Sequence, residues 1–273
     1  MLPSILIVLH QEHSSPGRIG HRLVQRGFRL DVRRPCLGDP LPATLKEHEG
    51  AIIFGGPQSA NDCHDYVRAE IDWIGVALAE SKPYLGVCLG AQMLARHLGA
   101  RVGHHPDGLV EIGYYPLRPT HAGAALLGPG PGADPITGEA LWPDHVYHWH
   151  REGFELPSGA ELLAEGEAFP NQAFRFGKAA FGIQFHPEVT HHMMCRWTLH
   201  GHARFDLPGA HPRRAHFDGR LQHDRKVQLW LDAFIDHWLA AGRPAGATGP
   251  VRRAGHLSGF SSRRGGRPSG ILG

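Results

Sequence analysis

The most constraining feature of the sequence is a cysteine flanked by glycines, in the stretch GVCLG at residues 86–90. A short apolar run at 84–86 predicts a strand before it, and helical spacing predicts a helix at 89–98. Small residues two positions before and after a nucleophile are typical of the tight turn from a strand into a helix. The turn projects its central side chain where open α/β sheets bind ligands. Cys88 is therefore a candidate nucleophile, and the N-terminus of the following helix favours its thiolate.

Alternating strand and helix patterns surround this turn in the first hundred residues. Continuous apolar runs predict short strands at 5–9, 28–32 and 51–54, and helical spacing predicts helices at 19–26 and 66–80. Strands that alternate with helices in this way favour a parallel sheet with helices on both faces.

The second half of the chain has a different pattern, with short segments separated by turns. Strands are predicted at 109–117, 146–148, 160–165, 172–176 and 180–185, helices at 189–205 and 221–241, and a loop at 121–138, which is rich in Gly, Ala and Pro. We therefore expect an α/β fold with an open, mostly parallel sheet to which short strands have been added.

The composition changes abruptly after Gly242. Residues 243–273 hold six Arg and no acidic residue, so the formal charge of +2 for the whole chain leaves residues 1–242 at −4. We expect one domain over 1–242 and a disordered basic tail, rich in Gly, Arg and Ser, over 243–273. The acidic body gives no reason to expect nucleic-acid binding.

Neither a membrane nor an oxidising compartment is indicated. No apolar run approaches the roughly 18 residues of a membrane span, and the apolar run near the N-terminus is too short for a secretory signal. The four Cys include no C-x-x-C pair, so we expect reduced thiols and a cytoplasmic protein.

A base for Cys88 is predicted at the end of another buried strand. The apolar stretch FGIQF at 181–185 is followed by His186, Pro187 and Glu188. In an extended segment, residues i and i+2 lie on the same side, so Glu188 can accept a hydrogen bond from one ring nitrogen of His186. The other nitrogen is then free to face a thiol.

Attack on a carbonyl also needs donors for the developing oxyanion. Gly55 and Gly56 follow the predicted strand at 51–54, at the same sheet edge as Cys88. Their backbone N–H groups can approach a substrate because no Cβ stands in the way. The N–H of Leu89, just after the nucleophile, is the second candidate donor.

Several groups of histidines stand close together in the sequence, and alternating histidines on a strand can bind a metal ion. They are His104 and His105; His145, His148 and His150; His191 and His192; and His200 and His202. No acidic or Cys partner completes a ligand set with them, so we expect no metal site.

Three stretches together resemble the class I glutamine amidotransferases, which use Cys, His and Glu: GVCLGAQ at 86–92, FGGP at 54–57 and GIQFHPEV at 182–189. The likeness extends over about residues 4–240. Within this family, the chain is most similar to the stand-alone GMP-synthase-like proteins. Their W-H-x-D-x-F-x-L-P segment corresponds to 149–157, where Glu152 takes the place of Asp. The resemblance implies a flavodoxin-like fold.

The resemblance also implies a reaction. Cys88 would attack the side-chain amide of glutamine, Gly56 and Leu89 would hold the oxyanion, His186 would protonate the departing ammonia, and Glu188 would orient His186. Contacts to glutamine are implied for Gln92, Gly55 and the backbone near His148 and Trp149. This chemistry needs no cofactor.

Two questions stay open at the level of sequence. The same residues suit a glutaminase that delivers ammonia, a γ-glutamyl peptidase or hydrolase, or a non-catalytic regulatory module on this fold. No G-x-x-x-x-G-K-[ST] loop and no S-G-G-x-D-S motif is present in the 273 residues. A glutaminase of this kind would therefore supply ammonia to a separate synthetase or acceptor subunit.

Overall fold

A computed structural model describes residues 2–127 and 142–242. Its centre is an eight-stranded sheet in the order β2-β1-β3-β4-β12-β11-β10-β7. The strands are β1 (Ser4–Val8), β2 (Arg29–Arg33), β3 (Gly50–Ile53), β4 (Tyr84–Val87), β7 (Arg118–Pro119), β10 (Ala160–Glu165), β11 (Asn171–Phe176) and β12 (Ala180–Ile183). The first five strands of this order run parallel, and β11, β10 and β7 continue the sheet in antiparallel pairings. The expected α/β fold, with a mostly parallel sheet and added short strands, is confirmed.

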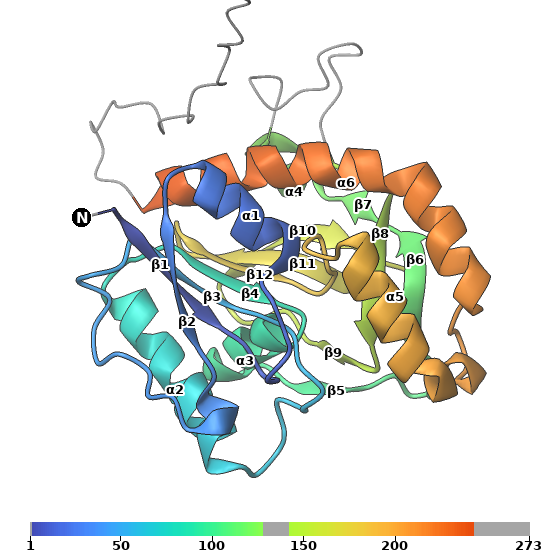
Figure 1. Ribbon diagram of the computed structural model, residues 1–273, viewed down its shortest axis with the longest axis horizontal. Coiled ribbons are helices and arrows are strands. Elements are labelled where there is room, and N and C mark those ends of the chain that lie inside the picture. The colour runs from blue at the N-terminus through green and yellow to red at the C-terminus, as the bar shows by residue number, and fades with distance from the viewer. Residues whose placement is uncertain (1, 128–141, 243–273) are drawn as a thin grey trace, which may run out of the picture.

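Helices cover both faces of this sheet (Figure 1). One face carries α1 (Gly17–Gln25) and α6 (Arg213–Ala241), and the other carries α2 (Asp65–Ala79) and α3 (Leu89–His97). Strand β1 shows why its sequence is aliphatic throughout. Ile5 and Ile7 pack in the core beneath α1 and α6, whereas Leu6 and Val8 pack in the core beneath α2 and α3. A central strand with alternating sides needs apolar residues at every position when both sides are buried.

Two further strand pairs lie outside the main sheet. Strand β6 (Glu111–Pro116) pairs with β8 (His145–His150), and β5 (Val102–His104) pairs with β9 (Glu152–Phe154). The remaining elements are α4 (His121–Leu126), α5 (His191–His200) and two short 3-10 helices, η1 (Pro35–Leu37) and η2 (His202–Asp206).

Three predictions about helices and loops are corrected by the structure. The helix predicted at 189–205 ends at His200, because the chain turns at Gly201, where an added Cβ would lie 2.4 Å from the Trp149 ring. The helix predicted at 221–241 begins eight residues earlier, at Arg213. Its first part was missed because the residues buried there are His216 and Gly219 and not aliphatic ones.

The third correction concerns the loop predicted at 121–138. Its first residues form α4, which begins after Thr120, whose hydroxyl accepts a hydrogen bond from the backbone N–H of Gly123. The rest of that predicted loop and the whole predicted tail at 243–273 lie outside the described residues.

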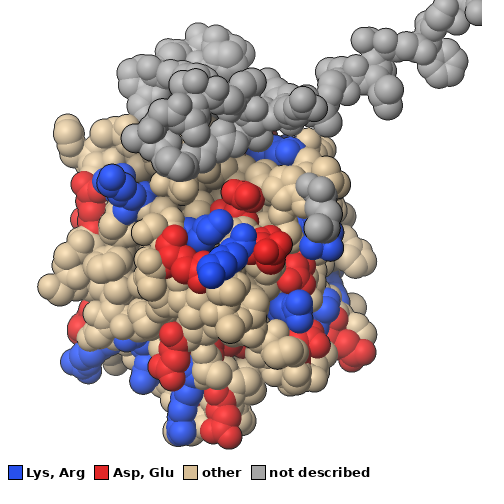
Figure 2. Space-filling view, turned by 90° about the vertical axis from the view of Figure 1, so that its left-hand side faces the viewer, with Lys and Arg blue, Asp and Glu red and all other residues tan. Residues whose placement is uncertain are grey.

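Figure 2 shows one face, on which acidic and basic side chains are interspersed and form no patch of one sign. Between α1 and α6, Arg26 pairs with Asp236 at 2.7 Å and with Asp232 at 3.3 Å. Among the helices that the structure describes, none combines the length and the apolar character needed to cross a bilayer.

Candidate active site

Cys88 occupies a strained turn between β4 and α3. Its backbone has φ 51° and ψ −104°, a conformation that costs an L-residue about 1–3 kcal/mol. Gly86 and Gly90 must be glycines, because neither position has room for a Cβ atom. A Cβ on Gly86 would lie 2.4 Å from the backbone of Gly90, and a Cβ on Gly90 would lie 2.0 Å from the carbonyl oxygen of Ile53. The sequence G-x-Cys-x-G thus forms the tight turn that it predicts, with Cys88 at the carboxyl end of a central strand.

Pairing between β4 and β12 brings His186 to this turn. Val87 is opposite Ile183, and the N–H of Cys88 donates to the carbonyl of Ile183 at 2.8 Å. The chain leaving β12 therefore passes Cys88. A Cβ on Gly55 would lie 2.9 Å from Cε1 of His186 and 3.4 Å from Cβ of Cys88, so these three residues meet at one point.

His186 and Glu188 form a buried pair. Nδ1 of His186 lies 2.7 Å from Oε1 of Glu188, and the two side chains are 4% and 3% exposed. Burial lowers the pKa of His186, but the charges of Glu188 and Cys88 and hydrogen bonds to both outweigh it and raise the pKa to about 10. The pair is arranged to hold a protonated imidazole between a carboxylate and a sulfur.

The loop that carries this pair is held by Arg18, a residue that sequence reasoning did not single out. Its guanidinium donates to the carbonyl of Pro187 at 3.2 Å and to that of Val189 at 3.1 Å, on either side of Glu188. Asp224 on α6 accepts from the same guanidinium at 2.9 Å. No local motif marks Arg18, because its partners come from distant parts of the chain.

Gly55, the first residue of the glycine pair, is contacted by His10, which itself pairs with Glu70. His10 lies 3.2 Å from the carbonyl oxygen of Gly55 through Nδ1 and 2.8 Å from Glu70 through Nε2. His10 and Glu70 are fully buried. Gly56, the next residue, lines the cleft beside Cys88 and Leu89.

A cleft that is open to solvent lies next to Cys88. Its lining residues are Gly56, Pro57, Gln58, Ser59, Cys88, Leu89, Gln92, Trp149, His150, Arg151, Glu152 and Arg204. Two of the predicted glutamine contacts, Gln92 and Trp149, are among them, whereas Gly55 and His148 are not. His148 is fully buried and stands one residue before Trp149 on β8.

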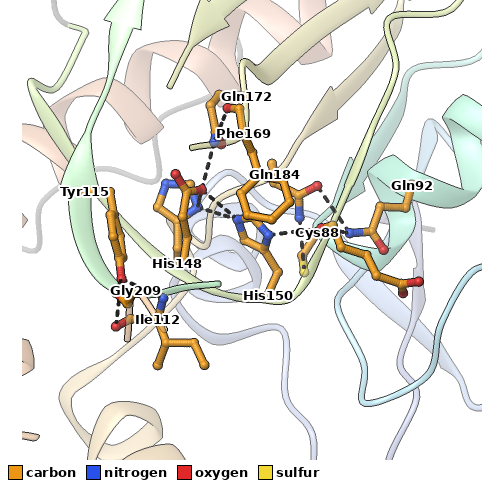
Figure 3. A network of polar contacts seen from close by, with 12 residues as sticks. Cys88, Gln92, Ile112, Tyr115, His148, His150, Phe169, Gln172, Gln184 and Gly209 are labelled. Atoms are coloured by element: carbon orange, nitrogen blue, oxygen red, sulfur yellow. Dashed lines mark hydrogen bonds and ion pairs between the residues drawn. The ribbon is translucent and has the colours of Figure 1, made fainter. Parts of the chain in front are cut away.

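Gln184 joins Cys88 to Gln92 (Figure 3). Its Nε2 donates toward Sγ of Cys88 at 3.6 Å, and its Oε1 accepts from Nε2 of Gln92 at 3.2 Å. The same Nε2 of Gln92 donates to the backbone carbonyl of Glu152 at 2.8 Å. Gln184 was not predicted as a site residue. The signal available in the sequence was a buried amide two positions before His186, on the same side of an extended segment.

Charged groups gather on one side of the cleft. Arg151 joins β8 to β9, Glu152 is the first residue of β9, and Arg204 comes from η2, far along the chain. Burial, followed by the charge of Arg151, lowers the pKa of Arg204 below its usual value. No local pattern in the sequence predicts Arg204 at this position.

Comparisons with curated proteins identify the family of this chain. Residues 11–196 match the model of the family described as glutamine amidotransferase class-I. The glutamine amidotransferase-like protein YfeJ of Salmonella typhimurium is 32% identical over 67% of this chain and 74% of its own length. A glutamine-hydrolysing GMP synthase of Legionella pneumophila is 33% identical over 52% of this chain. The match spans about a quarter (26%) of that synthase's length.

Solved structures agree with this assignment. A glutamine amidotransferase from Methylobacillus flagellatus has a TM-score of 0.75 and 26% identity, and the match covers 94% of this chain and 98% of that one. A glutamine amidotransferase from Thermotoga maritima has a TM-score of 0.73 and 25% identity, covering 88% and 99% of the two chains. This chain belongs to the class-I glutamine amidotransferase family.

Proposed function

We propose that this protein hydrolyses the side-chain amide of glutamine to glutamate and ammonia. The observation that carries the proposal is Cys88 in a strained turn at the end of β4, next to the buried His186–Glu188 pair. A cysteine nucleophile needs a group that can donate a proton to the leaving amine and later accept one from water. His186, oriented by Glu188, is that group.

The proposed reaction has two steps, formation of a thioester and its hydrolysis. Sγ of Cys88 attacks the amide carbon, and a proton from His186 allows the C–N bond to break, which releases ammonia and leaves a γ-glutamyl thioester. Water then attacks the thioester carbon while His186 accepts its proton, and the C–S bond breaks to give glutamate. In both steps the N–H groups of Gly56 and Leu89 stabilise the oxyanion.

Recognition of free glutamine would use the charged side of the cleft. Glutamine carries one ammonium and one carboxylate, and Glu152, Arg151 and Arg204 supply the opposite charges. Gln92 and Trp149 border the same space, and the backbone near His148 and Gly55 lies next to it.

A separate synthetase would consume the ammonia in this proposal. The relatives named GMP synthase are much longer than the part that matches, and these 273 residues carry neither of the two ATP-site motifs sought in the sequence.

All four Cys are free thiols, which suits a reducing compartment such as the cytosol.

A γ-glutamyl peptidase or hydrolase is the second candidate, and one observation favours it. The cleft holds two Arg and one Glu, whereas free glutamine offers a single carboxylate. A γ-glutamyl amide whose amine part carries a second carboxylate would use Arg151 and Arg204 together.

Glutamate release from glutamine and from a panel of γ-glutamyl amides tests both candidates. We expect release from glutamine by the wild type, alone or with a candidate synthetase, and none by Cys88→Ala. A strong preference for a γ-glutamyl amide would replace the first proposal by the second. Failure of a glutamine-analogue probe to label Cys88, together with no release from any substrate, would point to a non-catalytic module.

A further inference from the structure

Three buried polar side chains come together on the strand pair β6–β8. Glu111 on β6 pairs across the ladder with His150 on β8, and His148 lies two residues earlier on the same face of β8. Figure 3 shows the side chains of His148 and His150 next to each other. The relative exposures are 1% for Glu111, 0% for His148 and 4% for His150. His150 also lines the cleft that contains Cys88.

The ligand-type atoms of this cluster form a small triangle. Nε2 of His150 lies 2.9 Å from Oε2 of Glu111 and 3.0 Å from Nδ1 of His148, and the third side is 3.5 Å. In a tetrahedral zinc site with bonds of about 2.0 Å, ligand atoms are about 3.3 Å apart. One ion can therefore lie about 2 Å from all three atoms without rearrangement of the strands.

The hydrogen bonds around the triangle match those that surround metal ligands. Nδ1 of His150 lies 3.0 Å from the carbonyl of Glu152, which only accepts, so this nitrogen carries the ring proton. In a neutral ring, Nε2 then presents a lone pair to the carboxylate, which also has only lone pairs. Either a metal ion or a second ring proton between the two atoms resolves this contact. Histidine ligands commonly donate their other N–H to a backbone carbonyl in this way.

The carboxylate of Glu111 also accepts a hydrogen bond from a neighbouring side chain, that of Gln172. Nε2 of Gln172 donates to Oε2 of Glu111 at 2.9 Å and to the carbonyl of Phe169 at 2.9 Å. Oε1 of Gln172 is buried and has no partner within the described part of the chain. It lies on the amide that contacts Glu111 and can accept from a water that completes an ion's coordination.

The third ligand-type atom belongs to His148. Its Nδ1 faces Nε2 of His150 at 3.0 Å and Oε2 of Glu111 at 3.5 Å, so it is the ring nitrogen that an ion within the triangle would meet. Nε2 of the same ring is buried and has no partner among the described residues.

We propose that Glu111, His148 and His150 bind one divalent transition-metal ion, with Zn²⁺ as the best match to two imidazoles and a carboxylate. The ion would join β6 to β8 and fix the segment from His150 to Glu152, which borders the cleft. It has no part in the thioester chemistry. The sequence analysis expected no metal site because no acidic or Cys partner completed a ligand set with these histidines. Glu111 comes from 39 residues before His150.

A second group of possible ligands provides a matched control. Asp144, His145 and His223 also lie close together, but they are more exposed, and Lys226 lies 3.4 Å from Asp144. A cation there would face this ammonium group. His223→Ala therefore reports binding by surface histidines, and Cys88→Ala reports binding by the thiol next to His186.

The test is titration of the full-length protein with Zn²⁺ alone after removal of metals with a chelator, followed by calorimetry and thermal unfolding. We expect one equivalent to bind and to raise the unfolding temperature with Zn²⁺ concentration. Glu111→Gln should weaken binding at least about 100-fold, beyond the effect of most outer-shell substitutions. His223→Ala and Cys88→Ala should bind as the wild type does. Equal binding by Glu111→Gln, or loss of binding in either control, would overturn the proposal.

Cobalt provides a readout on the wild type that does not depend on any variant folding. Bound Co²⁺ should give the visible bands of a tetrahedral site without a near-ultraviolet thiolate band. No visible bands, or a thiolate band, would contradict the proposed ligands. A wild type that binds no Zn²⁺ would show that the cluster is a metal-free hydrogen-bonded network, whatever the outcome of the glutaminase assay.

Discussion

Nη2 of Arg18 donates to both carboxylate oxygens of Asp224, at 2.9 and 3.0 Å, in a buried ion pair that joins α1 to α6. The same guanidinium holds the carbonyls of Pro187 and Val189, which flank Glu188. The ion pair therefore connects the packing of two helices to the position of Glu188, which pairs with His186.

Removal of Arg18 should affect both stability and the site. In Arg18→Met, Asp224 keeps Arg220 at 3.3 Å and Gln228 at 2.8 Å but loses its most buried partner. We expect a loss of about 3 kcal/mol in the free energy of unfolding, measured with urea. Arg18→Met combined with Asp224→Asn should lose less than the sum of the single variants, because no buried charge is left unpaired. Additive losses would show that the two groups are not coupled.

If Arg18 positions Glu188, Arg18→Met should also change the pH profile of Cys88 alkylation. A variant that is destabilised but keeps the wild-type profile would limit Arg18 to a structural role.

Cys88→Gly should be more stable than Cys88→Ala. Both variants remove the thiol, but only glycine adopts φ 51° without strain. We expect a difference of about 1–3 kcal/mol in the free energy of unfolding in favour of glycine. Urea titrations of the two variants measure it. Equal free energies of unfolding for the two variants would mean that the turn accommodates a Cβ atom without strain.

Glu188→Gln should reduce glutamate release by about 100-fold or more, since general acid–base catalysis contributes about 10²–10⁴-fold. The substitution keeps the shape of the side chain but removes its charge. The turnover number should fall more than KM rises, because Glu188 acts through His186 and does not line the cleft. A variant with wild-type turnover would remove Glu188 from the proposed mechanism.

The same pair predicts how stability depends on pH. The pKa of His186 is raised to about 10 in the folded protein, despite burial, by Glu188 and Cys88. Its stabilisation is thus complete below the unfolded pKa of about 6.5 and is lost as the pH rises through about 10. Urea unfolding of the wild type between these values should show this decline, and Glu188→Gln should show a shallower one.

Gln92→Glu should disturb the cleft more than Gln92→Met. The glutamate carboxylate would replace the amide that donates to the carbonyl of Glu152 and to Oε1 of Gln184, so acceptors would face acceptors. We expect a cost of about 1–3 kcal/mol and a higher KM for glutamine. Steady-state kinetics and urea unfolding of both variants check this. Gln92→Met serves as the control for lost hydrogen bonds without added charge.

Local rules in the sequence determined the parts of the site that depend on neighbouring residues. Gly86 and Gly90 predicted the turn at Cys88 because no Cβ fits at either position. Alternation along an extended segment placed Glu188 beside His186, and the structure has this pair at 2.7 Å. The aliphatic β1 predicted a central strand because both of its faces are buried.

Only the tertiary structure decided which distant residues meet. The pairing of β12 with β4 brings His186 to Cys88, α6 brings Asp224 to Arg18, and β6 brings Glu111 to His150. No sequence pattern encodes such contacts, because they depend on how strands pair and helices pack across the chain. The spacing of aliphatic residues did not predict the first part of α6, because the residues buried there are His216 and Gly219. The sequence thus determined the local chemistry of each element, and packing determined which of these elements act together.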